Sequence, residues 1–182
     1  MSAQPPAFKH AGLVNHYPGF TLGPLDLELE PGRVLGFVGP NGAGKTTTLA
    51  CMVGLVRPDA GHVEICGTRA NPRSGGFRND VGFVGEETGF WAEWTVEQNL
   101  AAVGTFRTGW NQARAVALAS RFGLSLKAKV KALSRGNRTK LALVAAMAHA
   151  PRLLLLDEPT AGLDPVVRAE VLDTLWEVLE DE

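Results

Sequence analysis

The chain has 182 residues, a formal net charge of −1 and an apolar content of 45%. This length suits one domain with a real core, and the near-zero charge excludes a strongly basic nucleic-acid surface and a highly charged disordered tail. Two cysteines, Cys51 and Cys66, form neither a metal-binding spacing nor a disulfide framework, so we expect reduced, buried thiols in a cytosolic protein. We expect no signal peptide, and the longest apolar stretches are too short to span a bilayer.

The N-terminal part of the chain predicts an antiparallel β layer. Strand-like patterns cover Phe8–Tyr17 and residues 20–30, and in the second pattern leucines alternate with acidic residues, as in a strand with one solvated face. Residues 33–38 (RVLGFV) are short, apolar and β-prone, so they predict a buried strand. A further short strand is expected at residues 62–67, after a turn.

Residues 39–46, GPNGAGKT, match the phosphate-loop pattern G-x-x-x-x-G-K-[ST]. They lie between the predicted strand at 33–38 and an apolar stretch at 47–56 that predicts a helix, which is the order of elements that the motif requires. A glycine-rich turn before a helix is the simpler alternative, but a chance match at four fixed positions is rare in a chain of this length.

Each residue type in the loop suits a triphosphate. Glycines allow the backbone to turn its N–H groups towards an anion, and the next helix adds unpaired N–H donors and the positive end of its dipole. Lys45 supplies a mobile positive charge for the β- and γ-phosphates, and the Thr46 hydroxyl can ligate Mg²⁺. The residues that we predict to bind the nucleotide here are Gly39, Pro40, Asn41, Gly42, Ala43, Gly44, Lys45, Thr46 and Thr47.

The second half of the chain predicts two short strands separated by helices. Residues 71–80 are polar and glycine-rich and are expected to be exposed. Residues 81–85 (VGFVG) and 152–157 (RLLLLD) predict strands, the second buried and parallel by composition, and a loop is expected at 86–94. Residues 166–180 predict an amphipathic helix.

Between these strands the chain predicts a helical insertion, from about residue 95 to residue 150. Thr95 begins a capping box, Asn111 is placed to cap a second helix, and Ser134 is placed to begin a third. The expected architecture is an α/β core with a β layer before it and helices inserted into it.

A hydrophobic strand that ends in two carboxylates is the second chemical signal. Asp157 is expected at the C-terminal edge of its strand, where ligands gather in α/β sheets, and it can hold Mg²⁺ through water opposite Thr46. Glu158 can polarise an attacking water as general base. A solvated acidic turn is the alternative, but the upstream phosphate loop favours the catalytic interpretation.

A third segment, LSRGN at residues 133–137, stands at a predicted helix start between the loop and the acidic strand. With these motifs in this order, the chain resembles the ATP-binding subunit of ABC transporters over nearly its whole length. GPNGAGKTT is similar to the Walker A loop, LLLLDEPTAGLDP to Walker B and the D-loop, and LSRGN stands where the family has LSGGQ. KVKALSRGNRTKLALV and GLDPVV look similar to the subgroup that serves ABC-2-type exporters.

The resemblance implies a fold. It is an α/β P-loop NTPase with a RecA-like parallel sheet core, an N-terminal antiparallel β layer and a helical signature subdomain. We expect a single ATPase domain over residues 1–182, with the core and β layer at about 1–94 and 150–182 and the helical subdomain at about 95–149.

The resemblance also implies roles for particular residues. Tyr17 matches the aromatic residue that stacks on adenine, with a packed strand-end tyrosine as the alternative. The family works as a head-to-tail dimer, in which Ser134 and Gly136 would contact the γ-phosphate held by the other protomer's Lys45. Asp164 matches the D-loop residue at that interface. ATP would close this homodimer or heterodimer and hydrolysis would open it, which drives a separate integral-membrane permease.

The expected cellular place and direction follow from the same resemblance. The subunit would bind peripherally at the cytoplasmic face of the cell membrane, and transport is expected to be export. Its cofactors would be ATP and Mg²⁺, and no nucleic-acid partner is expected.

Three departures from the family pattern bear on activity. Glu86 stands where the family usually has glutamine; a carboxylate can still ligate Mg²⁺, so we expect altered coupling and not inactivity. Arg135 and Asn137 replace signature residues, while the serine and second glycine remain. The family's switch histidine, which follows one more strand, has no counterpart before Glu182. We therefore expect an N-terminal piece of a longer subunit that hydrolyses ATP poorly by itself.

The absent strand has a structural consequence in the family fold, where it lies between the Walker A and Walker B strands. Without it, central backbone donors and acceptors are left unpaired, which is costly.

Residues 89–94 (GFWAEW) place three large aromatic side chains in the loop that, in the family, receives the permease's coupling helix. We expect Phe90 or Trp91 to be part of that contact and Trp94 to pack on the following helix. The alternative is that all three belong to the core.

Two other functions stay open. A non-transport ABC ATPase would act on ribosomes or DNA, but relatives of that kind carry tandem domains or a long coiled coil, which are not seen here. A regulatory module would bind ATP without turnover; Glu158 argues against it and the missing histidine argues for it.

Overall fold

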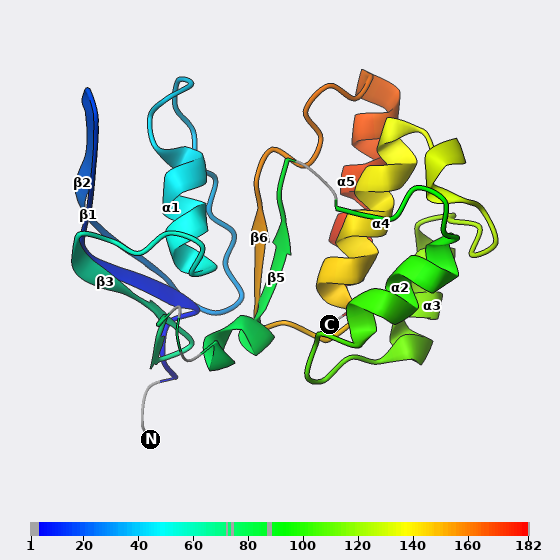
Figure 1. The fold of residues 1–182 in the computed structure, drawn as a ribbon, viewed down its shortest axis with the longest axis horizontal. Helices are drawn as coiled ribbons and strands as arrows, with labels where there is room; N and C mark the ends of the chain where they lie inside the picture. Colours follow the sequence, from blue (N-terminus) through cyan, green and yellow to red (C-terminus); the bar gives the residue numbers. More distant parts are fainter. Residues whose placement is uncertain (1–3, 72, 74, 87–88, 182) are drawn as a thin grey trace. The chain divides into compact units, whose positions relative to one another are not determined.

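The computed structural model describes residues 4–71, 73, 75–86 and 89–181. The chain divides into two compact units, Met1–Val81 and Gly82–Glu182. Positions 72 and 74 of the predicted exposed stretch, and positions 87 and 88 of the predicted loop, lie outside the described residues. In Figure 1 the first unit runs from blue to green and the second from green to red.

The first unit is built on an antiparallel sheet. Its strands are β1 (Phe8–Tyr17), β2 (Phe20–Leu29), β3 (Ala60–Ile65) and the short β4 (Thr68–Arg69), hydrogen-bonded in the order β2-β1-β3-β4. Each pair is antiparallel, so the predicted N-terminal β layer is confirmed. In β2 the later leucines are half-buried and the acidic residues between them are exposed, as their alternation predicts.

One helix packs on this sheet. Helix α1 (Lys45–Met52) begins at the phosphate loop and contacts β3 (Figure 1). It ends before the predicted residue 56, because Gly54 adopts a left-handed conformation with φ 68°. The largest fully buried side chains of the sheet and helix include Phe8, Leu13, Met52, Val63 and Ile65.

The segment after β4 is only partly exposed. A short 3₁₀ helix, η1 (Gly76–Asp80), buries Phe77 against Gly54, where an added Cβ would lie 2.8 Å from the ring. The expected exposure of residues 71–80 is therefore wrong at Phe77, because this ring covers the end of α1.

The strand predicted at residues 33–38 is not formed. These residues have no regular secondary structure, and Val34, Leu35 and Val38 are 72%, 40% and 98% exposed. A strand needs hydrogen bonds to a neighbouring strand, and a parallel strand also needs cover on both faces. No strand in the described part of the chain pairs with this segment, so its composition alone does not hold it in a sheet.

The second unit joins a two-stranded sheet to α-helices. Strands β5 (Val81–Val84), which begins at the boundary, and β6 (Leu153–Leu156) pair with each other. The Asp157 amide donates a hydrogen bond to the Val84 carbonyl at 2.8 Å, so both strands end at the same edge, as in parallel pairing. The helical elements are α2 (Val96–Gly104), α3 (Gln112–Arg121), the 3₁₀ turn η2 (Val130–Ala132), α4 (Arg135–Met147) and α5 (Pro165–Glu180).

The predicted helix starts are confirmed. Thr95 and Gln98 form a complete capping box at the start of α2. The Asn111 side chain accepts a hydrogen bond from a first-turn amide of α3 at 3.0 Å, and the Ser134 hydroxyl does the same for α4 at 3.2 Å. These side chains pair amide groups that the helices leave free.

Helix α4 is central to the core of the second unit. It contacts α2, α3 and α5 (Figure 1). Its large buried apolar side chains are Leu141, Leu143, Val144 and Met147. Those of α5 are Val171, Leu175 and Val178, which confirms the predicted amphipathic helix. Among the described residues, no helix has both the length and the apolar character that crossing a bilayer requires.

One buried histidine of the first unit lacks hydrogen bonds. His10 on β1 is 1% exposed, and neither ring nitrogen has a partner within the described residues. Its cross-strand neighbours are Leu27 and Val63, and the Phe8 ring lies 5.2 Å away. Burial lowers the pKa of His10 from 6.5 to about 4, because a charged imidazolium is poorly solvated there.

We predict that His10 makes the fold acid-sensitive. Protonation favours the unfolded chain, where the imidazole regains its usual pKa. The folded state therefore has its full stability with respect to His10 above pH 6.5 and loses stability as the pH falls towards 4. Between pH 7 and pH 4.5, urea unfolding should show the wild type losing about 2.5 kcal/mol more than His10→Leu. The control is His16→Leu, which removes an exposed histidine of the same strand. Its free energy of unfolding should fall between pH 7 and pH 4.5 as much as that of the wild type. An undiminished acid loss in His10→Leu would contradict this assignment.

Candidate functional site

The phosphate loop has the backbone shape that its glycines predict. Gly42 and Gly44 have φ of 82° and 92°, in the left-handed region where side chains are disfavoured. Gly44 is the N-cap of α1, so the unpaired N–H groups of the first helical turn follow the loop directly. The loop is exposed from Asn41 to Ala43, and it offers backbone donors at the surface.

Lys45 folds back over this loop. Its ammonium donates hydrogen bonds to the carbonyls of Gly39 and Pro40 at 2.9 and 3.1 Å. The Thr48 hydroxyl donates to the Gly44 carbonyl at 2.9 Å, which fixes the first turn of α1. Thr46 is exposed on the same turn. The predicted cation and hydroxyl are therefore both at the loop.

An aromatic pair lies beside the loop, at the tip of the β1–β2 hairpin. Tyr17 and Phe20 are opposite each other across the turn, and their rings stack with centroids 6.5 Å apart. Tyr17 is 41% exposed, so part of its ring is open to a ligand, and both its expected stacking on adenine and the packed strand-end alternative stay open. A Cβ added to Gly44 would lie 2.6 Å from Leu22 Cδ1 and 3.3 Å from Phe20 Cζ, so the hairpin packs directly on the loop.

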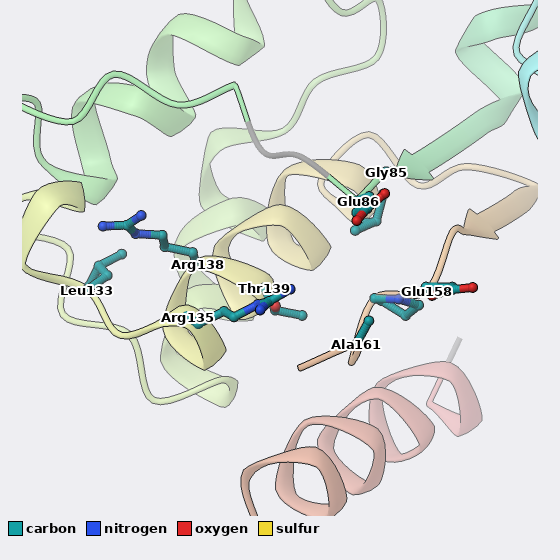
Figure 2. Close-up of a pocket in the computed structure, with 10 residues that line it drawn as sticks. Gly85, Glu86, Leu133, Arg135, Arg138, Thr139, Glu158 and Ala161 are labelled. Atoms are coloured by element: carbon teal, nitrogen blue, oxygen red, sulfur yellow. The ribbon is translucent and has the colours of Figure 1, made fainter. Parts of the chain in front are cut away.

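The second unit contains a pocket of about 430 Å³ at the edge where β5 and β6 end. Figure 2 shows its lining side chains coming from the ends of both strands and from the start of α4. Two predicted carboxylates, Glu86 and Glu158, share this pocket with Arg135 and Arg138. The other lining residues are Val84, Gly85, Leu133, Thr139, Pro159 and Ala161.

Glu158 has an unusual backbone conformation. Its φ is 48°, in the left-handed region, and the next residue is Pro159, which disfavours helical conformations before it. The Glu158 carbonyl accepts a hydrogen bond from the Ala161 amide at 2.9 Å, which closes a tight turn. Strain of this kind persists where the surrounding structure imposes it, and it is common at functional sites.

The neighbouring Asp157 is largely buried, and its side chain has no partner within the described residues. It is 7% exposed, and its carboxylate forms no hydrogen bond or ion pair within the described part of the chain. A carboxylate that has no protein partner is free to bind a cation. Mg²⁺ is commonly held by one or two carboxylates together with substrate phosphates. Thr46 and Asp157 belong to different units, and their predicted pairing across Mg²⁺ stays a prediction.

The LSRGN segment forms the start of α4. Ser134 is exposed, whereas Gly136 is buried, and a Cβ added to Gly136 would lie 2.5 Å from Val167 Cγ1. The guanidinium of Arg135 lies against Gly162, in the loop that leads to α5. Gly136 thus has a packing role that the motif alone does not reveal, and the expected phosphate contacts of Ser134 and Gly136 stay predictions.

Asp164 is the N-cap of α5. Its carboxylate accepts hydrogen bonds from the amides of Val166 and Val167, both at 3.1 Å. It is exposed, and its expected place at a dimer interface stays a prediction.

The aromatic loop before α2 presents two rings to solvent. Trp91 and Trp94 are 47% and 42% exposed, and they stack with centroids 4.8 Å apart. Phe90 is half-buried and packs on the core of the second unit. The alternative in which all three belong to the core is therefore wrong. The Trp94 ring stacks on Trp91, and its expected packing on the following helix stays a prediction.

A buried amide fixes this tryptophan pair. The Asn99 side chain accepts a hydrogen bond from the Trp91 amide at 2.8 Å and donates one to the Trp91 carbonyl at 3.1 Å. The Val130 amide donates to the Trp94 carbonyl at 3.0 Å. The loop is thus tied to α2 and to η2.

Comparison with known proteins agrees with these motifs. The sequence profile of the family described as "ABC transporter" matches residues 22–161, which is more than half of the chain. The chain belongs to this family. The resemblance that the Walker and signature motifs predict is confirmed.

The relatives of this ABC chain include proteins named for export. It is 35% identical over 161 residues to the "Nod factor export ATP-binding protein I" of Paraburkholderia xenovorans (strain LB400), covering 85% of this chain and 53% of the relative. It is 40% identical over 156 residues to the "Daunorubicin resistance ATP-binding protein DrrA3" of Streptomyces coeruleorubidus, covering 83% and 49%. The chain spans about half the length of these curated relatives.

Solved structures confirm the ABC ATPase fold. The chain matches cbiO1 from Clostridium perfringens, part of the ABC transporter complex cbiONQ, with a TM-score of 0.83 and 25% identity, covering 98% of this chain and 75% of that one. It matches an ATP-binding subunit of an ABC transporter with a TM-score of 0.79 and 27% identity, covering 94% and 74%. The predicted α/β P-loop NTPase fold with an antiparallel β layer is therefore correct.

We predict that Gly136→Ala destabilises the chain, although alanine favours helix. The new methyl group would overlap Val167, and overpacking of this kind costs about 1–3 kcal/mol in urea unfolding. Val167→Ala in the same chain should restore most of this loss. Gly89→Ala is the control, since a Cβ there meets nothing within 4 Å. Unchanged stability of Gly136→Ala would refute the close packing of α4 on α5.

Proposed function

We propose that this chain binds and hydrolyses ATP as the ATP-binding subunit of an ABC transporter, and that the transporter exports its substrate. The phosphate loop carries the proposal, because left-handed glycines, a helix N-terminus and the Lys45 ammonium occur together at one exposed loop. The name of one relative, a Nod factor export ATP-binding protein, supports export as the direction.

In this proposal the loop binds the triphosphate. Lys45 exchanges its carbonyl partners for phosphate oxygens, and the N–H groups at Gly42, Gly44 and the first turn of α1 donate to the β-phosphate. Thr46 and Asp157 are the residues that would hold Mg²⁺, each with an oxygen that suits this ion. When bound, the metal neutralises charge on the β- and γ-phosphates.

Glu158 is the proposed general base. Its carboxylate, exposed at the pocket, can accept a proton from the water that attacks the γ-phosphate. The pocket also contains Glu86, the proposed second carboxylate ligand near Mg²⁺. Because Glu86 carries charge where an amide is usual, we infer altered coupling between the site and its membrane partner.

Transport requires partners in this account. We infer that two ATPase domains pair head to tail, with the exposed Ser134 and the N-terminus of α4 turned to the partner's γ-phosphate and Asp164 at the interface. ATP closes the pair and hydrolysis opens it. An integral-membrane permease converts this motion into transport, with the ATPase on the cytoplasmic face of the membrane.

The stacked pair of Trp91 and Trp94 is the proposed permease contact. Exposed tryptophans are rare on free surfaces and common at the centres of interfaces. The hydrogen bonds from Asn99 hold the Trp91 backbone in place, so little ordering is needed on binding. Phe90 is half-buried and packs on the core of the second unit, and it stays a second candidate for this contact.

We predict that Lys45→Ala weakens ATP binding about ten- to hundredfold, because it removes charge-assisted hydrogen bonds to phosphate. Calorimetry of ATP with Mg²⁺ binding to the chain measures this. Lys9→Ala, which removes an exposed lysine of the same unit, is the control and should bind like the wild type. Equal ATP affinity in Lys45→Ala and the wild type would exclude the loop as the phosphate site.

We predict that Trp91→Ala with Trp94→Ala reduces cosedimentation with inverted membrane vesicles of the source organism at least about tenfold, the loss of two interface aromatics. Vesicles treated with protease should bind neither protein, since the contact is to a membrane protein. Phe106→Ala, at an 81% exposed ring elsewhere in the unit, is the control. Unchanged binding by the double variant would show that the permease docks elsewhere.

A further inference from the structure

The hairpin tip and the phosphate loop form one packed group in the first unit. The Phe20 ring stacks on Tyr17 on one side, with centroids 6.5 Å apart and planes inclined by 23°. On the other side the Phe20 ring edge approaches Gly44, the last glycine of the loop, so closely that a Cβ there would lie 3.3 Å from Cζ. Leu22, which is buried, completes this contact.

Phe20 therefore connects the two parts of the site that a nucleotide would bridge. Directly opposite residues of an antiparallel pair interact through their side chains, so the Tyr17 ring cannot turn freely while Phe20 lies against it. Offset aromatic pairs prefer centroid separations of about 4.5–7 Å, which includes this pair. Phe20 is 37% exposed, so much of its ring is not buried in the sheet.

We propose that Phe20 is a positioning residue, which holds the Tyr17 ring at a fixed place relative to the phosphate loop and thereby sets the base-dependent part of nucleotide affinity. This rests on the proposed ATP binding and on the expectation, from the family resemblance, that Tyr17 stacks on the base. The ligand group concerned is the aromatic base of a nucleoside triphosphate. The phosphates contact the loop and not this pair.

The physical reason is preorganisation. A free tyrosine at a hairpin tip loses rotamer entropy when a base stacks on it, and a ring already held by Phe20 has less to lose. Gly44 takes part because a side chain there would force the tips of Leu22 and Phe20 to shift. Glycine at this position thus serves both the left-handed backbone and the approach of Phe20.

The test compares two probes, ATP and inorganic tripolyphosphate, each with Mg²⁺, bound to the 182-residue chain. In Phe20→Ala the Tyr17 ring is no longer held in place for the base. Losing this base stacking should weaken ATP binding about tenfold. Tripolyphosphate has no base, so its affinity for Phe20→Ala should be within about twofold of its affinity for the wild type. Phe20→Tyr should restore ATP binding. Phe20→Leu keeps an apolar contact to Gly44 but has no ring. Its affinity for ATP should fall, and its affinity for tripolyphosphate should not change.

A double-mutant cycle tests whether Phe20 acts through Tyr17. Tyr17→Ala with Phe20→Ala should bind ATP no more than about twofold more weakly than Tyr17→Ala, because the two residues act as a unit. Phe106→Ala is the control for removing an exposed phenylalanine. Additive losses, equal losses for ATP and tripolyphosphate, or unchanged ATP binding in Phe20→Ala would each overturn the proposal.

The same data separate this inference from the proposed function. A wild type that binds neither ATP nor tripolyphosphate would overturn both the proposed function and the positioning role of Phe20. A wild type that binds ATP tightly, with Phe20→Ala unchanged, would overturn only the positioning role of Phe20.

Discussion

The hydrogen bond from the Asp157 amide to the Val84 carbonyl joins the ends of β5 and β6, and the arrangement of the second unit depends on it. Glu86 and Glu158 follow these strands closely, so they reach the same edge of the sheet and line the same pocket. Because the start of α4 lines the other side, the signature segment and the two carboxylates face one space (Figure 2).

That pocket is also where this chain differs from its family. Arg135 stands in place of a glycine, and its guanidinium lies against Gly162 in the loop between Glu158 and Asp164. The contact joins the start of α4 to the segment that follows Glu158, the proposed general base. It also brings positive charge to a pocket that holds two carboxylates, and both features are absent from a signature that has glycine here.

Backbone constraints govern the first unit as well. Gly44 ends the phosphate loop, caps α1 and receives the aromatic hairpin, which places three demands on one residue. Only glycine meets them all, because its φ of 92° and its contacts with Leu22 and Phe20 both exclude a Cβ.

Local chemistry explains what the sequence predicts well. Helix caps at Thr95, Asn111 and Ser134 depend on neighbouring amides, and the alternation in β2 depends on one solvated face, so each can be deduced from the sequence. Glu86 and Glu158 line one pocket because each follows the end of a strand and the two strands end at the same edge.

Tertiary packing explains what the sequence does not predict. Residues 33–38 have strand-like composition, but no strand in the described part of the chain pairs with them. Phe77 is buried because its ring packs on the end of α1. The contacts of Gly136 with Val167 and of Phe20 with Gly44 join segments far apart in the chain. No local pattern encodes them, and both bear on residues that the motifs explain only in part.

The most direct test of the account is ATP turnover by this chain and its Glu158→Gln variant, over a series of protein concentrations. The account predicts equal ATP affinity for both and a low turnover in the wild type, which still rises more steeply than linearly with concentration and is lost in the variant, because the general base is removed. Equal turnover by the two proteins would contradict the account, because hydrolysis would then not depend on Glu158.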